Sequence, residues 1–98
     1  MTDSNTRIAF AWYKPEQWDQ LRAVSVDRDR LEDTYTEWVS GAESSFEDYR
    51  ANGLDIFKII IDVNELVAWC KKEGREIDSA ARSELAAIKL KELEDRRT

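Results

Sequence analysis

One stretch of sequence decides the fold, Leu54-Asp55-Ile56-Phe57-Lys58-Ile59-Ile60-Ile61-Asp62. Six of its nine residues are large and apolar, and β-branched and aromatic residues of this kind favour strands. Side chains of a strand point alternately to its two faces, and here apolar side chains fall on both. We therefore expect a strand whose two faces are mostly covered, or one that leaves a face open to a partner.

A second strand is predicted near the start of the chain, over residues 7–13. Large apolar residues (Ile8, Phe10 and Trp12) alternate there with two alanines. A period of two with large aromatic residues is typical of a strand. The alanine face is small enough to lie close under a helix.

Four helices are predicted between and after the strands, over about 15–24, 34–53, 62–73 and 79–96. Helix starts are marked by Pro15, by a Thr34/Glu37 capping box, and by Asp62 and Asp78. Gly53 and Gly74 mark two helix ends. The side chains expected to face inward are Trp18, Leu21, Leu31, Tyr35, Trp38, Ala42, Ser45 or Phe46, Tyr49, Leu66, Val67, Cys70, Ala81, Leu85, Ile88 and Leu93.

The expected fold is therefore α+β, in the order β-α-α-β-α-α, with a two-stranded sheet packed against about four helices. We expect a disordered N-terminal tail over residues 1–6 and a single domain over 7–98. An isolated pair of strands is marginal, and its open edges invite pairing. A homodimer that extends the sheet through a strand edge is therefore kept open.

The composition excludes several kinds of active site. The 98 residues contain no His, one Cys and three isolated Gly, and the net charge is −6. These counts rule out a Ser-His-Asp triad, an imidazole metal ligand, an internal disulfide and a glycine-rich phosphate loop. We therefore assign no catalytic residue, metal or cofactor. With no signal peptide, no membrane-spanning run and a lone Cys70, we expect a cytoplasmic protein.

Negative charge is concentrated in the first half of the chain. Residues 16–48 hold ten acids against three bases, whereas residues 51–98 hold ten acids and nine bases. Such a field repels phosphate backbones and anionic membranes and attracts cationic partners. The acids expected to form this face are Asp27, Asp29, Glu32, Asp33, Glu37, Glu43, Glu47 and Asp48.

Three aromatic residues gather around the first turn, Trp12, Tyr13 and Trp18. Trp and Tyr dominate interface hot spots, so this turn is a candidate binding corner beside the acidic face. Core packing is the competing interpretation, and it is favoured for Trp38. The hypothesis we adopt is a small acidic, non-enzymatic protein-binding or regulatory module whose partner is a basic protein.

Other functions stay open as alternatives. The acids could mimic nucleic-acid charge in an inhibitor of a basic protein. A pocket between sheet and helices, of about 300 Å³ or more, could serve a small ligand or an enzyme. The last two helices outline a helix-turn-helix with bases at Arg75, Arg82, Lys89, Lys91, Arg96 and Arg97, although four acids on the last helix make nucleic acid an unexpected partner. Residues 27–33 alternate carboxylates and arginines, but a calcium loop would need a glycine there.

Overall fold

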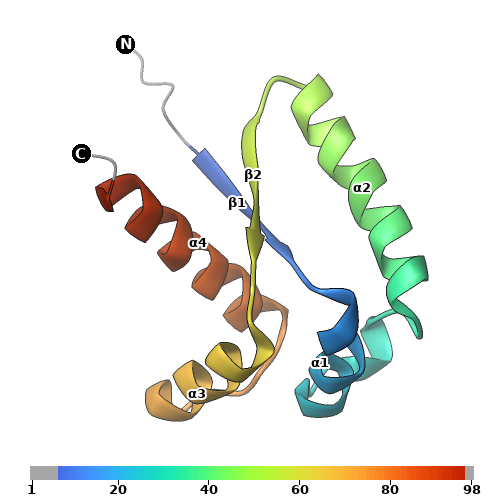
Figure 1. Cartoon of the computed structure of the whole chain (residues 1–98), viewed down its shortest axis with the longest axis vertical. Coiled ribbons are helices and arrows are strands. Elements are labelled where there is room, and N and C mark those ends of the chain that lie inside the picture. Colours follow the sequence, from blue (N-terminus) through green and yellow to red (C-terminus); the bar gives the residue numbers. More distant parts are fainter. Residues whose placement is uncertain (1–6, 97–98) are drawn as a thin grey trace.

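The computed structural model describes residues 7–96, and the expected N-terminal tail lies outside them. Figure 1 shows two strands between two longer helices. The element order confirms the predicted α+β class and its β-α-α-β-α-α plan. The elements are β1 (Arg7–Trp12), the 3₁₀ turn η1 (Pro15–Gln17), α1 (Trp18–Val24), the 3₁₀ turn η2 (Arg28–Arg30), α2 (Tyr35–Ala51), β2 (Asp55–Ile60), α3 (Val63–Glu73) and α4 (Ser79–Arg96).

The two strands of the sheet run parallel. Arg7 pairs with Asp55 at one end and Trp12 with Ile60 at the other. The pairing continues one step further, because Ile61 N–H donates to the Trp12 carbonyl at 2.8 Å. Parallel strands need a long crossover, and α1 and α2 supply it here. The sequence predicted the sheet but not its direction.

Helices cover both faces of the sheet. The alanines Ala9 and Ala11 lie on the face that packs toward α4, and most of the sheet's contacts with helices join β1 to α4. On the opposite face, Phe10 and Trp12 meet Phe46 of α2, with ring centroids 6.0 and 6.4 Å apart. The predicted close helix over the alanines is therefore confirmed. Each face of the sheet packs against a helix of the same chain.

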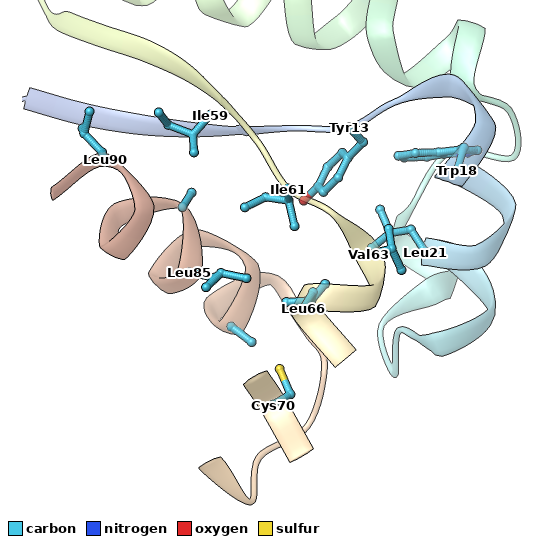
Figure 2. Packing of buried hydrophobic residues seen from close by; sticks show 12 residues of the cluster. Tyr13, Trp18, Leu21, Ile59, Ile61, Val63, Leu66, Cys70, Leu85 and Leu90 are labelled. Carbon is cyan, nitrogen blue, oxygen red and sulfur yellow. The ribbon is translucent and has the colours of Figure 1, made fainter. Parts of the chain in front are cut away.

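The main core lies where the strands end, between α1, α3 and α4 (Figure 2). Leu21 from α1, Leu66 from α3 and Ile61 after β2 are fully buried there. Leu85 and Leu90 of α4 close the cluster on the side of the sheet. The inward positions predicted for these helices are largely confirmed, namely Trp18, Leu21, Ala42, Phe46, Leu66, Cys70, Ala81 and Leu85.

Two residues predicted to face inward are exposed instead. Tyr49 of α2 is 46% exposed and Leu93 of α4 is 47% exposed. Tyr49 lies beside a cleft along β1, and Leu93 lies with Ile60 at a hollow beside β2. Within the described residues 7–96, the sheet has no third strand on either side to cover them.

The helix boundaries follow the predicted caps. The Thr34 hydroxyl accepts from the Glu37 N–H at 3.1 Å, and the Glu37 carboxylate accepts from the Thr34 N–H at 3.3 Å. Asp62 and Asp78 cap α3 and α4 by accepting from backbone N–H groups of the first turns. Gly74 ends α3 with a left-handed backbone (φ 66°), which glycine adopts without strain.

Candidate functional site

The three aromatic residues of the predicted binding corner lie inside the protein. Trp12, Tyr13 and Trp18 are 9%, 5% and 2% exposed. They surround Trp38 of α2, with ring centroids 5.0, 5.1 and 5.3 Å from it. Aromatic pairs at such distances contribute packing energy beyond their buried area. The structure therefore brings the corner together, but little of these side chains is left for a partner to touch.

The predicted acidic residues lie on α2 and on the loop before it. Some are already bound within the chain: Asp33 pairs with Arg22 at 3.4 Å and Glu43 with Lys58 at 3.0 Å. The Glu37 carboxylate serves the helix cap. Of the remaining predicted acids, all within residues 7–96, four are exposed and make no ion pair, namely Asp29, Glu32, Glu47 and Asp48.

Asp27 is held in a buried ion pair. Arg82 of α4, only 6% exposed, donates from Nη1 to Oδ1 at 2.9 Å and from Nη2 to Oδ2 at 2.8 Å. It also donates to the Ser25 hydroxyl at 3.2 Å. The hydrogen bonds from Arg82 lower the pKa of Asp27, and burial raises the pKa of the neighbouring Tyr13 to about 12.

Sequence reasoning missed this pair because it counted Arg82 among the bases of a DNA-reading helix. The helical spacing held a signal. Arg82 stands three residues before Leu85 and four before Ala86, so it shares their apolar face. An arginine on such a face needs an acid, and Asp27 supplies it.

An open cleft of about 500 Å³ runs beside β1. Four consecutive strand residues line it, from Ile8 to Ala11. Because successive side chains point to opposite faces, a cleft that touches four in a row reaches the edge of the strand. The cleft also extends to Leu54 and Ile56 at the start of β2. A second hollow, of about 480 Å³, shares five lining residues with it, Phe10, Leu31, Trp38, Ser79 and Arg82.

The two walls of this cleft differ in chemistry. Trp38 and Tyr49 of α2 make one wall with the Phe10 ring, which lies 6.2 Å from that of Tyr49. Ser79 and Ser83 of α4 make the other wall. The cleft is thus apolar on one side and polar on the other, with the edge of β1 between them.

The alternative sites receive less support. Within the part of the chain that the structure describes, no cluster of three or more metal-ligating side chains occurs. Cys70 is buried, and desolvation raises the pKa of its thiol. In the helix-turn-helix outline, Arg75 pairs with Glu84 and Lys89 with Glu65, so acids neutralise bases that DNA would need. Over residues 7–96 no helix has the length and hydropathy to cross a bilayer.

No family model, curated protein or solved structure matches this chain. The function is therefore argued from the geometry of its own residues. The cleft beside β1 is the site where an open sheet edge and an apolar wall come together, and the unpaired Glu32 lines the hollow that adjoins it.

Proposed function

We propose that this chain is a non-enzymatic protein-binding module that takes a basic protein at the cleft beside β1. The observation that carries the proposal is the cleft itself, an open apolar-walled channel along an unpaired strand edge. Unpaired strand edges bind other chains unless something covers them.

Charge around the cleft supports a basic partner. Glu32 lines the hollow that continues the cleft. Asp48 follows the lining residue Ser45 by three positions, so it lies on the same side of α2. Arg30 is a base on this rim, but the surrounding segment 16–48 is strongly acidic. Such a field speeds the encounter with a cationic partner in a salt-dependent way.

The polar groups in the cleft support binding rather than catalysis. Burial raises the pKa of Tyr13 to about 12, and Arg82 is paired with Asp27. Ser79 and Ser83 would need a neighbouring base to act as nucleophiles, and the chain has no histidine. The buried Cys70 thiol suits a reducing compartment, and we propose the cytoplasm as the setting.

The test is a binding measurement with a matched pair of charge variants. The protein is immobilised, partners from the native host are captured at low salt, and each captured protein is then purified for affinity measurements. We expect the double change Glu32→Lys with Asp48→Lys to weaken binding by about tenfold or more. The control, Glu73→Lys with Glu76→Lys, makes the same charge change at exposed positions at the end of α3 and beyond it. Equal affinities for the two double variants, or affinity independent of salt, would contradict the proposal.

A small-ligand site is the second candidate, and the size of the cleft favours it. Its volume of about 500 Å³ exceeds the minimum expected for such a site, and Tyr13, Ser79 and Ser83 are polar groups on its lining. A metabolite screen by thermal shift tests this candidate. A compound whose thermal shift disappears in Ser83→Trp would support a small-ligand site in the cleft. Compounds that shift the variant and the wild type equally would show that they bind elsewhere.

A homodimer through a strand edge stays a proposal, and we assign it to β2 rather than β1. Ile60, 50% exposed, and Leu93 stand together at a hollow of about 320 Å³ beside β2. Sedimentation of the wild type and of Ile60→Lys tests this. We expect the wild type to sediment as a dimer and Ile60→Lys to sediment as a monomer. A monomeric wild type at tens of micromolar would overturn the proposed dimer.

A further inference from the structure

The part of the β1 edge that lines the cleft offers four backbone hydrogen-bonding groups. The Trp12 carbonyl accepts from Ile61, so Trp12 turns its polar groups toward β2. Since N–H and C=O directions alternate along a strand, the groups of Ala9 and Ala11 point away from β2. Both alanines line the cleft. Arg7 has the same orientation but does not line the cleft, so the lining part of the edge within residues 7–96 presents two N–H donors and two C=O acceptors.

This edge has a defined end. The next carbonyl with the same orientation belongs to Tyr13, and the Tyr35 hydroxyl donates to it at 3.0 Å. Tyr35 is itself held in the aromatic cluster, 5.5 Å from Trp38. The chain thus closes the edge after Ala11 and leaves Ala9 and Ala11 for an incoming strand.

The cleft fits one extended strand better than the sheet of a second copy. Its walls, α2 and α4, rise on both sides of the β1 edge, and Figure 1 shows these helices on opposite sides of the strands. A second copy would bring its own pair of helices to the same place. It would also bring another net charge of −6. Both facts favour a thin, positively charged segment.

The walls specify the pattern of that segment. Side chains of an added strand alternate between the two walls. Those facing α2 meet Phe10, Trp38 and Tyr49, where large apolar groups fit. Those facing α4 meet Ser79 and Ser83, where small or polar groups fit.

Acids stand near both ends of the cleft. Glu32 lies toward the end of β1, since its carbonyl accepts from the Trp18 ring N–H at 3.1 Å. Asp48 lies toward the other end, since it precedes Tyr49, whose carbonyl accepts from the Leu54 N–H at 3.1 Å just before β2 begins beside Arg7. Lysine or arginine at the ends of the segment would meet these carboxylates.

We infer that the partner binds by adding an extended basic segment to β1 as a third strand of the sheet. Such strand addition obtains affinity from main-chain hydrogen bonds and specificity from alternate side chains. The inference deepens the proposed function and rests on it. It names the partner as a peptide segment with alternating bulky apolar and small residues between basic ends.

The test uses a synthetic peptide of about eight residues, alternating valine and serine, with a lysine at each end. Amide hydrogen exchange of the ¹⁵N-labelled protein is followed by NMR with and without the peptide. We expect exchange at Ala9 and Ala11 to slow by about tenfold at saturation. Phe10 N–H, already directed at β2, serves as the internal reference. Peptide binding that leaves the two alanine amides unprotected would overturn strand addition. The proposed function, binding of a basic protein, would not be contradicted by that result.

Matched variants complete the test. Ser83→Trp fills the α4 wall and is expected to weaken peptide binding by about tenfold or more. Ser44→Trp places the same side chain at an exposed position of α2 and is the control. Equal binding by both variants, or none by the wild type at millimolar peptide, overturns strand addition. A peptide with glutamate ends that protects the alanines equally well would instead contradict the basic partner and support strand addition alone.

Discussion

Arg82 and Asp27, 55 residues apart in sequence, bind each other through two parallel hydrogen bonds of 2.9 and 2.8 Å. This fork ties α4 to the loop between α1 and η2. A buried ion pair contributes little net stability, but removing one partner leaves the other charge stranded. The pair therefore makes the packing of α4 depend on the segment that carries the acidic face.

Replacing one member of this pair is expected to be costly. Arg82→Met leaves the Asp27 carboxylate half-buried without its guanidinium, and we expect a loss of about 3 kcal/mol in the free energy of unfolding. Arg30→Met, at an exposed position, is the control and should change stability by less than about 0.5 kcal/mol. Urea denaturation measures both, and similar midpoints for the two variants would contradict the prediction.

The same pair predicts acid sensitivity. The folded state lowers the pKa of Asp27, so its stabilising contribution is present above the unfolded pKa of about 3.9 and is lost as pH falls through the folded value. Asp27→Asn removes this titration. We expect the variant to be less stable than the wild type near neutral pH and the difference to shrink below about pH 4. A difference that stays constant with pH would argue against it.

Tyr13 is expected to make the stability of the folded protein fall at alkaline pH. Burial raises its pKa from 10.0 to about 12, so the folded protein keeps a proton that the unfolded chain loses. Stability is full below about pH 10 and falls as pH rises toward 12, by on the order of 2–3 kcal/mol. Tyr13→Phe should flatten this fall, whereas Tyr49→Phe, at an exposed position, should not. Unfolding midpoints in a pH series distinguish the two.

Trp18 separates hydrogen bonding from packing. Trp18→Phe keeps an aromatic ring but removes the N–H that donates to the Glu32 carbonyl, and we expect a loss of about 1–2 kcal/mol. Trp18→Ala also opens a cavity in the core and should cost about 3–5 kcal/mol. Denaturation together with near-ultraviolet circular dichroism checks both. Equal losses would mean that the ring itself contributes no packing.

Two glycines should respond to the same substitution with opposite sign. Gly41 lies inside α2, and an added Cβ would meet no atom within 4 Å. Gly41→Ala should therefore raise stability by about 1 kcal/mol. Gly53 has a φ of 86°, which an L side chain rarely adopts, so Gly53→Ala should lower stability. Thermal unfolding of the two variants measures the contrast, and a shared sign would contradict it.

The sequence was most informative where structure is set locally. The alternation at residues 8–12, the Thr34 capping box and the caps at Asp62 and Asp78 each depend on a few neighbouring residues, and the structure has all of them. The direction of the two strands depends on the path of the crossover, which no local pattern encodes. The sheet was therefore predictable, but its parallel pairing was not.

The errors at Tyr49 and Leu93 have a common cause. Helical periodicity shows which side chains share a face, but not whether the sheet beneath extends far enough to cover them. Within residues 7–96 the sheet has two strands, which is too narrow to cover either side chain. The cleft was hidden from sequence reasoning for the same reason, since it exists because a third strand is missing.

The parallel pairing also affects how the protein is made. Every pair in the sheet joins residues 48 positions apart, as in Arg7 with Asp55, so β1 leaves the ribosome well before β2 exists. At translation rates of about 5–20 residues per second, the first strand spends seconds without its mate. During that interval the side chains of Phe10 and Trp12 can pack only against α1 and α2, which follow β1 in the chain. We therefore expect the sheet to form only after β2 has been synthesised.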